Sequence, residues 1–222
     1  MNISHCKSNI NAMLCNTSLF HPSMYNVLFP FYAVWLYTTC SYYDFTKNKE
    51  SYAKQVDLHK VETIFYNVYG WLPASMGAVL TLKPITADYN SPGLELLHLL
   101  MNIVFGEIWF YSLHRMLHLK PFYKFHKKHH EITNTVGLLA LYAHPFDAIV
   151  VNLGSIYALH AVVGFSALQL FVVGSYATIN TVLHSHSSTA SNSPHQLHHL
   201  RFNVNYGLNL FMDKWLKTRA ES

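Results

Sequence analysis

Histidines gather in three short clusters in the second half of this chain. Twelve of the sixteen histidines fall between His114 and His199. The clusters read HRMLH from His114, HKKHH from His126 and HQLHH from His195. Spacings of three and four residues place side chains on one face of a helix, so each cluster can direct two or three imidazoles at one point. The fold has to bring these separate segments together.

The number and type of these side chains indicate a metal site with more than one ion. Neutral imidazole suits iron, zinc and copper, whereas magnesium and calcium prefer oxygen ligands. One zinc ion takes three or four protein ligands, and the three clusters supply eight imidazoles. We therefore expect two metal ions close together, with positions left open. Copper fits the ligand type as well as iron. The zinc protease motif H-E-x-x-H is absent, because Glu131 follows His130.

The composition is that of a membrane protein. Hydrophobic residues make up 51% of the chain and charged residues only 12%, against roughly 25% charged residues in soluble domains. The 15 tyrosines and 14 phenylalanines fit rings that lie at a membrane interface. The three cysteines form no C-x-x-C pair, which excludes a thiolate zinc site and gives no sign of a disulfide framework. We expect no removable signal peptide.

Apolar segments predict the membrane spans. They cover residues 24–40, which Pro30 interrupts, and residues 61–82, 94–113 and 146–183. The last segment is long enough for two spans of about 20 residues each, and a hairpin there returns the third histidine cluster to the side of the first two. We expect an all-α integral membrane bundle of about four to five spans with a histidine-rich helical cap. The first segment could instead be re-entrant or interfacial.

Three regions follow from these segments. We expect residues 1–22 to form a polar N-terminal segment, residues 23–93 to hold the first membrane spans and their connections, and residues 94–222 to form the histidine-rich domain. Basic residues surround the histidine clusters, and by the positive-inside rule they place the clusters on the cytosolic side. A nucleic-acid-binding surface is a poorer interpretation, because apolar spans separate the basic groups. These residues are Arg115, Lys120, Lys124, Lys127, Lys128, Arg201, Lys214, Lys217 and Arg219.

The order of the motifs resembles that of the fatty acid hydroxylase/sterol desaturase superfamily. The chain has HxxxH, HxxHH, a Tyr-Ala-His-Pro segment at 142–145, and HxxHH followed by Asn-Tyr-Gly at 205–207. The segment 213–218 is similar to the family's D-x-x-x-G-T ending, with Lys217 where glycine is usual. The resemblance covers roughly residues 94–218. The Tyr-Ala-His-Pro segment favours the sterol-oxidising branch over the ceramide hydroxylases.

The resemblance implies a specific activity and a set of ligands. Family members are integral membrane enzymes with a histidine-bound di-iron centre. They use O2 and electrons from NAD(P)H, relayed through cytochrome b5, to hydroxylate or desaturate a sterol or fatty-acyl lipid. We therefore expect an enzyme of the endoplasmic reticulum membrane. Carried over to this chain, the ligands are His114, His118, His126, His129, His130, His144, His184, His195, His198 and His199.

We expect the remaining polar residues and histidines either to contact the ligands or to have no part in the site. Asp147, Asn180 and Asn205 are expected to bond the distal ring nitrogens of ligands, with helix capping as the alternative, and Glu131 is a further candidate. Tyr142 and Tyr206 are candidates for the substrate entrance or for interface anchors. His98 and His160 are interpreted as packed histidines, and His186 as a solvated one. His5, His21 and His59 are expected at the surface.

Two other functions remain open. A metal transporter or storage protein would spread its ligands along the spans, whereas here they gather at one end. A non-catalytic family member would keep the fold without turnover. Whether the reaction is hydroxylation or desaturation depends on sub-ångström geometry, and the substrate, electron donor and oligomeric state are also open at this point.

Overall fold

The computed structural model describes residues 22–85, 91–190 and 193–220, and within these ranges the chain is helical with irregular connections and no strand. The prediction of an all-α fold is confirmed. The expected polar segment 1–22, including His5 and His21, lies outside the described residues apart from Pro22.

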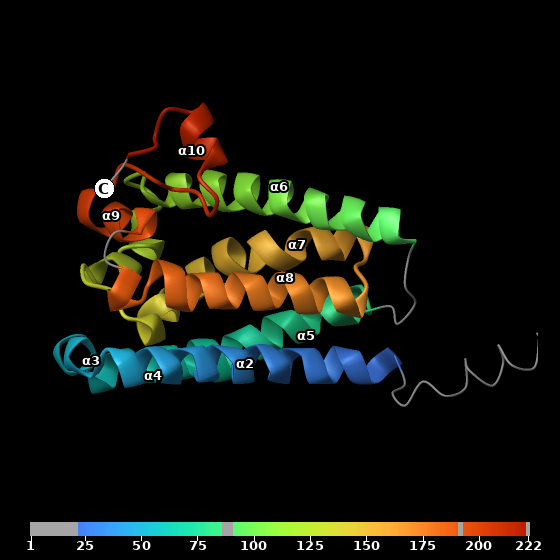
Figure 1. Cartoon of the computed structure of the whole chain (residues 1–222), viewed down its shortest axis with the longest axis horizontal. Coiled ribbons are helices and arrows are strands. Elements are labelled where there is room, and N and C mark those ends of the chain that lie inside the picture. Colours follow the sequence, from blue (N-terminus) through green and yellow to red (C-terminus); the bar gives the residue numbers. More distant parts are fainter. Residues whose placement is uncertain (1–21, 86–90, 191–192, 221–222) are drawn as a thin grey trace, which may run out of the picture.

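Long helical segments run side by side along the longest axis of the molecule (Figure 1). Helix α2 packs against α5 and α8, and α6 packs against α7. Buried apolar side chains, among them Phe29, Met76, Tyr157 and Leu170, fill the space between α2, α5, α7 and α8. The segments are α2 (Pro22–Lys47), α4 (Leu58–Phe65), η1 (Tyr66–Trp71), α5 (Leu72–Leu82), α6 (Pro92–Leu117), η5 (Asp147–Leu153), α7 (Gly154–Val163), α8 (Ala167–Ile179) and η6 (Asn180–Ser185).

The long apolar run 146–183 folds back on itself as a helical hairpin, as predicted. Gly164 ends α7 with a φ of 73°, a left-handed conformation that glycine adopts without steric cost. Ser166 then begins α8 with a capping box, in which its hydroxyl accepts from the backbone N–H of Gln169 and the Gln169 side chain accepts from the Ser166 N–H. The hairpin returns the chain to the end of the molecule where α6 finishes (Figure 1).

Short elements gather at that end of the bundle and carry most of the clustered histidines. Helix α9 lies there, and α10 lies beside the C-terminal half of α6 (Figure 1). These elements are α3 (Lys49–Gln55), η2 (Tyr123–Phe125), η3 (His129–Glu131), η4 (Gly137–Leu141), η7 (Ser188–Ala190), α9 (Pro194–Arg201) and α10 (Phe211–Trp215).

Among the described residues, three segments of π-helix lie between or at the ends of the long helices. They are η1, η5 and η6. A π-helix bonds residue i to residue i+5, so it takes in more residues per turn than an α-helix, and it often occurs at functional sites. Side chains beyond such a segment therefore face a different direction from the one that α-helical spacing predicts. Both η5 and η6 lie close to the histidine clusters.

Membrane spans are supported for one helix. Among the described residues, only Pro92–Leu117 is long and apolar enough to cross a membrane, and 28% of its most apolar window is buried. Its outer surface exposes large apolar side chains, such as Leu97, Leu100 and Val104. The core helix of a soluble protein would hide them. The predicted four to five spans and the cytosolic position of the cap are not confirmed.

Candidate metal centre

The first cluster lies at the C-terminal end of α6. His114 and His118 are one helical turn apart, and His118 is the C-cap residue of the helix. The third cluster lies on α9, where the Ser193 hydroxyl accepts from the Gln196 N–H and Pro194 occupies the first turn. Serine at the cap and proline at the start are typical of a helix N-terminus. Both clusters have the helical spacing that the sequence predicts.

The second cluster is not on an α-helix. Residues 122–131 follow a series of tight turns, in which the His129 N–H donates to the His126 carbonyl and the His126 N–H donates to that of Tyr123. His129 and His130 belong to the short 3-10 segment η3. The turns nevertheless bring all three rings of this cluster towards the other two clusters, because a turn repeating about every three residues still returns side chains to one side.

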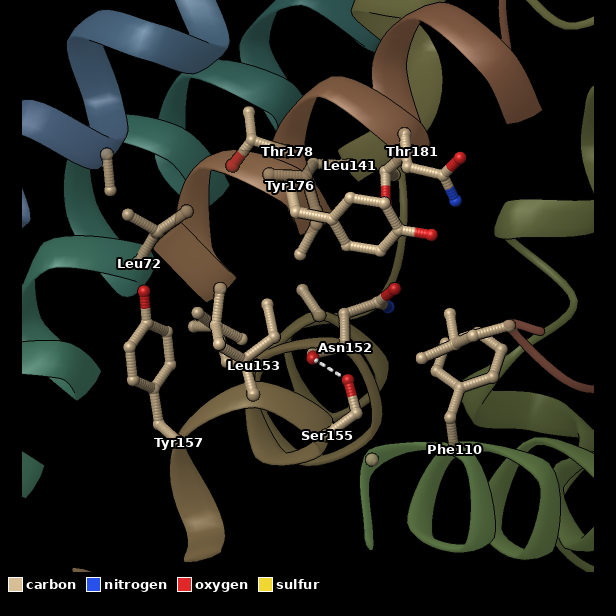
Figure 2. A pocket seen from close by; sticks show the side chains of 18 of the residues that line it. Leu72, Phe110, Leu141, Asn152, Leu153, Ser155, Tyr157, Tyr176, Thr178 and Thr181 are labelled. Carbon is tan, nitrogen blue, oxygen red and sulfur yellow. Dashed lines mark hydrogen bonds between the residues drawn. The ribbon is translucent and has the colours of Figure 1, made fainter. Parts of the chain in front are cut away.

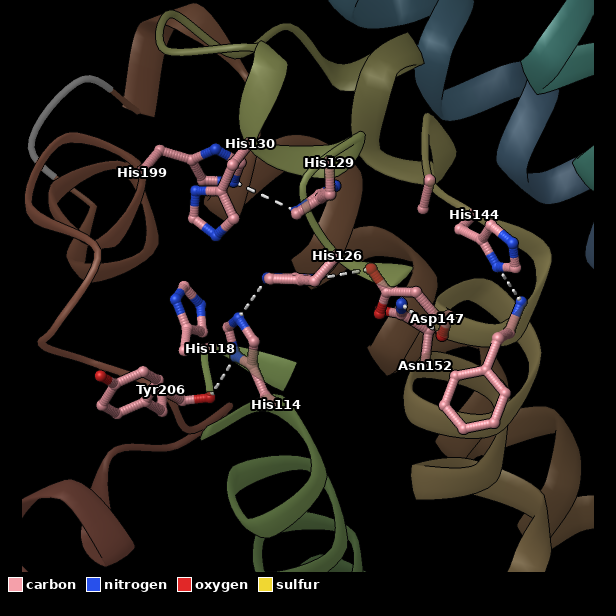
Figure 3. A network of polar contacts seen from close by, with 12 residues as sticks. His114, His118, His126, His129, His130, His144, Asp147, Asn152, His199 and Tyr206 are labelled. Carbon is pink, nitrogen blue, oxygen red and sulfur yellow. Dashed lines mark hydrogen bonds and ion pairs between the residues drawn. The ribbon is translucent and has the colours of Figure 1, made fainter. Parts of the chain in front are cut away.

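Nine histidines form two adjacent groups (Figure 3). Within each group, the ligand atoms all lie within 4.8 Å of one another. The groups touch, since the ring centroids of His130 and His199 are 4.7 Å apart. We call them the five-histidine group (His114, His118, His126, His130 and His198) and the four-histidine group (His129, His186, His195 and His199).

Hydrogen bonds to the outer ring nitrogens orient five of these rings. The Nδ1 atoms of His114 and His198 lie 2.7 and 2.6 Å from the carbonyl oxygens of Tyr206 and Val204. In the four-histidine group, Nδ1 of His199 is 2.8 Å from the Ile132 carbonyl, and Nδ1 of His186 is 2.8 Å from that of Thr181. Nδ1 of His126 bonds a carboxylate oxygen of Asp147 at 2.7 Å.

These Nδ1 contacts determine which nitrogen of each histidine ring carries the hydrogen. They also show whether the inner nitrogens are suited to bind a metal. A carbonyl oxygen can only accept, so Nδ1 carries the hydrogen and Nε2 of the neutral ring presents a lone pair. His114 and His126 both have this tautomer, yet their Nε2 atoms are 3.0 Å apart. Two lone pairs at that distance repel each other unless a cation lies between the rings. The residues therefore fit the two-metal centre that the histidine count predicts.

The same pattern holds for the other inner nitrogens. Nε2 of His198 is 3.1 Å from the Nε2 atoms of both His118 and His130. In the four-histidine group, Nε2 of His199 is 3.1 Å from those of His129 and His195. All inner atoms are thus imidazole nitrogens, a donor set that suits iron, copper and zinc rather than magnesium or calcium.

Protonation of the clustered histidines does not relieve the repulsion between their lone pairs at neutral pH. Burial, together with the neighbouring imidazoles, lowers the pKa of His118 to about 2. Burial lowers the pKa of His198 to about 3 and that of His186 to about 4. The pKa values of His129 and His199 are lowered for the same reason. At neutral pH these rings are uncharged, which is the form that binds metals.

Asp147 supports His126 as predicted for a residue that contacts a ligand's outer nitrogen. Its carboxylate is 2% exposed and comes from the first turn of η5. We expect Asp147→Asn to weaken metal binding by roughly 10- to 100-fold, the usual cost of losing such a partner. Metal titration of the purified protein measures this. Asp57→Asn, which changes an exposed helix cap, is the control, and unchanged metal affinity in Asp147→Asn would contradict the role.

The C-terminal loop holds the Tyr206 carbonyl against His114. Asp213 accepts from the N–H groups of Tyr206 and Gly207 at 2.9 and 2.6 Å, and from the Thr218 hydroxyl at 2.6 Å. Lys217 has a φ of 57°, in the left-handed region that glycine adopts freely. This conformation fits the glycine that the resemblance to a D-x-x-x-G-T ending implies at this position, and the ending supports a histidine in α6.

Glu107 fixes the same loop from the side of α6. It is fully buried, and its carboxylate accepts from the N–H groups of Asn209 at 2.6 Å and Met212 at 3.3 Å. Sequence reasoning missed Glu107. Its position in the apolar segment 94–113 could have revealed it, because an acidic residue inside an apolar span needs a partner.

Two of the ten expected ligands lie outside both groups. His144 accepts at Nδ1 from the Phe146 N–H, and Figure 3 shows it beyond Asp147, away from the clustered rings. It acts as a helix-start residue before Pro145. His184 is exposed on η6, whereas His186 is buried and joins the four-histidine group. Although it belongs to neither group, His184 lines the cavity beside them.

The other predicted supporting residues have varied positions. Asn205 donates to the carbonyls of Pro194 and Ala220, so it joins α9 to the C-terminal segment and touches no ring nitrogen. Glu131 accepts from the Tyr142 hydroxyl. Asn180 lines the space beside the histidines. His160, predicted to be packed, is buried and bonds the Lys83 carbonyl and the Phe165 N–H.

Two neighbouring cavities lie beside the histidines and in the interior of the helix bundle. The cavity beside the metal centre is lined by His114, His129 and His195, among others. The second lies between α5, α6, α7 and α8, where Figure 2 shows Leu72, Phe110, Tyr157 and Tyr176 around it. Residues that line both cavities are Phe110, Asn152, Asn180, Thr181 and Leu208. The two cavities are thus direct neighbours, separated by these shared side chains.

A protein-family comparison decides where this chain belongs. Residues 99–218 match the family model described as fatty acid hydroxylase. The chain belongs to the fatty acid hydroxylase family. The matched residues include all nine histidines of the two groups and the Asp213–Thr218 loop. The expected superfamily is thereby confirmed. Helix α2 and the segment α3–α5 precede the match.

Relatives among the curated proteins match about half of this chain in sequence. Fatty acid hydroxylase domain-containing protein 2 of Homo sapiens is 38% identical over 119 residues, which are 51% of this chain and 35% of that protein. Methylsterol monooxygenase 1 of Danio rerio is 34% identical over 116 residues, which are 47% of this chain and 40% of that protein. This chain thus spans well under half the length of these relatives. No solved structure matches.

Proposed function

We propose that this protein is a membrane-bound, O2-dependent di-iron oxygenase that hydroxylates or desaturates a sterol or fatty-acyl lipid. The observation that carries the proposal is the pair of adjacent imidazole groups beside two neighbouring cavities, one of which lies between apolar helices. Oxygenase membership is supported by the family and by relatives named methylsterol monooxygenase.

The protein's own residues would hold, orient and shield the reacting groups. When bound, two iron ions supply the activation of dioxygen and the removal of hydrogen from an unactivated C–H bond. The five-histidine group would hold one ion, and the four-histidine group the other with more room for a further ligand. Asp147 and the backbone carbonyls keep the lone pairs pointed inwards. The buried surroundings exclude water, which is the usual contribution of the protein around a reactive cofactor.

The substrate would enter the cavity between the helices from the membrane. Large apolar side chains on the outer faces of α2, α6 and α8, such as Phe31, Leu100 and Phe171, are exposed. They support embedding of the bundle in lipid, where polar surfaces would be costly. We propose an endoplasmic reticulum location with the histidines on the cytosolic side, following the basic residues beside them.

Polar side chains where the two cavities meet favour a substrate with a hydroxyl group near the oxidised carbon. Asn152, Asn180 and Thr181 line both cavities. A plain acyl chain offers these groups no partner, whereas a sterol with a hydroxyl beside the reacting carbon does. Relatives include proteins named methylsterol monooxygenase 1 and C-4 methylsterol oxidase. We therefore propose a sterol-type substrate.

Basic residues around the histidine end would receive an acidic electron carrier. Exposed cations there include Arg115, Lys120, Lys124, Lys127 and Arg201. Complementary charge raises the rate at which an electron-transfer protein meets its partner. We propose cytochrome b5, reduced at the expense of NAD(P)H, as that carrier. Its contribution should fall steeply as ionic strength rises.

A metal-storage or transport role fits the structure less well. Its ligands would form a path through the bundle, whereas the nine clustered histidines lie at one end. His160, inside the bundle, is fully bonded to backbone groups and is no step in such a path. A non-catalytic relative would lack a reason to keep a cavity beside the histidines.

The direct test is reconstitution of the purified protein in lipid nanodiscs. We expect two iron ions per chain and, with O2, NADPH, cytochrome b5 and its reductase, oxidation of a 4-methylsterol detected by mass spectrometry. Parallel reactions receive fatty-acyl lipids or the 3-deoxy analogue of the sterol. Two bound ions without oxidation of any lipid would support storage or a non-catalytic role. Fewer than two ions would overturn the proposed centre.

Substitution of Asn180 tests the choice of substrate. We expect Asn180→Leu to lower kcat/KM for the hydroxylated sterol by about 2- to 10-fold, the range that one lost hydrogen bond produces. It should leave turnover of the 3-deoxy analogue unchanged. Thr178→Val is the matched control, because Thr178 lines only the cavity away from the histidines. Equal losses for both substrates would contradict hydroxyl recognition.

A further inference from the structure

Asp44 is a buried carboxylate on α2, a helix that precedes the family match at residues 99–218. It is 2% exposed. Among the described residues no lysine or arginine forms an ion pair with it. A buried charge without a cation is expensive unless several donors surround it. The residue therefore needs an explanation beyond the packing of α2.

Four neutral donors from three parts of the chain surround this carboxylate. Oδ2 accepts from the Tyr52 hydroxyl at 2.9 Å and from the Gly137 N–H at 2.7 Å. Oδ1 accepts from the Asn48 amide at 2.6 Å and from the Ser187 hydroxyl. Gly137 and Ser187 are far from Asp44 in sequence, so Asp44 ties two distant loops to α2.

Both loops lead directly to the four-histidine group. Ser187 follows His186, whose ring lies in that group. Gly137 ends the connection that begins at His129 and contains Ile132, whose carbonyl bonds Nδ1 of His199. The loops also touch each other, since a Cβ on Gly137 would meet the Val182 side chain at 2.8 Å. The position of Asp44 thus bears on the positions of His129, His186 and His199.

Three histidines of the five-histidine group have other supports. His126 is held by Asp147, His114 by the Tyr206 carbonyl and His198 by the Val204 carbonyl. None of these contacts involves α2. A disturbance at Asp44 should therefore affect one group more than the other.

We propose that Asp44 is a positioning residue for the four-histidine group, and that α2 is in this way part of the metal centre. The inference rests on the proposed two-metal function of the histidines. Loss of the carboxylate would release the turn after His186 and the loop before Gly137. The four-histidine group would then bind its metal less tightly while the five-histidine group kept its own.

Three variants test this. Asp44→Asn keeps the size of the side chain and removes its charge, and Ser187→Ala removes the hydroxyl that links the loop of His186 to Asp44. Ser41→Ala is the matched control, because Ser41 lies on the same helix, is 4% exposed, and has a hydroxyl with no hydrogen bond. Each full-length protein is loaded with 57Fe, and its metal content and Mössbauer spectrum are measured.

We expect the wild-type protein and Ser41→Ala to bind two iron ions per chain. In Asp44→Asn and Ser187→Ala, one iron site should bind at least about 10-fold more weakly, with loss of one part of the spectrum and not the other. Equal loss of both sites would mean that Asp44 serves only general stability, and full occupancy of both would also overturn the inference. Fewer than two ions in the wild-type protein would instead overturn the proposed centre.

Discussion

Replacing His186 by alanine should remove one of the two bound metal ions and lower turnover by more than about 100-fold, beyond the loss typical of a ligand's hydrogen-bonding partner. Replacing His184 by alanine should change neither. The two histidines are two positions apart, but His186 is buried in the four-histidine group and its Nδ1 bonds the Thr181 carbonyl. His184 is exposed and belongs to neither group.

Metal content and steady-state turnover of the two variants are the measurements. His129→Ala and His198→Ala, one from each group, should behave like His186→Ala. His144→Ala should behave like His184→Ala. If His184→Ala lost metal while His186→Ala kept it, the assignment of the four-histidine group would be wrong.

Removal of the metals should lower the thermal unfolding temperature by more than about 10 °C. An ion held at 1,000 times its dissociation constant contributes about 4 kcal/mol of stability, and each kcal/mol corresponds to roughly 2–4 °C for a chain of this size. Without cations, the Nε2 lone pairs of His114 and His126 also face each other at 3.0 Å. The metal-free protein therefore loses binding energy and gains repulsion.

Chelation followed by thermal scanning in detergent measures this effect. Fe2+ should restore the unfolding temperature, whereas Mg2+ should not, since it prefers oxygen ligands. Recovery with Mg2+, or no shift after chelation, would argue that the imidazoles are a packed polar core rather than a metal centre.

The histidine clusters could be predicted because short helical spacing is a local property. His114 and His118 lie on α6, and His195, His198 and His199 lie on α9, with the predicted spacing. The hairpin could be predicted from the length of the uncharged run alone. In each case the residues that carry the signal are close in sequence.

The positions of His144 and His184 relative to the two groups could not be predicted from the sequence. His184 was carried over from the family resemblance, and residues 180–185 form the π-helix η6, which leaves His184 exposed while His186 belongs to the four-histidine group. His144 was carried over from a family motif, and a backbone contact two residues later occupies its ring nitrogen. Neither effect has a reliable signature in the sequence, because both depend on backbone geometry.

Hydrogen bonds between residues that are distant in sequence could not be predicted either. Asp44 is one acidic residue among several near the end of α2, and only the folded chain brings it to Gly137 and Ser187. Glu107 could have been suspected as an acid in an apolar span, but its partners in the loop after residue 207 could not.

The loop that holds the Tyr206 carbonyl has a consequence for the order of events during synthesis. The Thr218 hydroxyl bonds Asp213, and the Asn205 N–H donates to the Thr218 carbonyl. His114 is therefore oriented only after residue 218 has left the ribosome and docked. A nascent chain that already contains all nine clustered histidines still lacks a finished site. We therefore expect loading of the proposed iron centre to be post-translational, and a ribosome-stalled chain ending before Thr218 should not retain the metal.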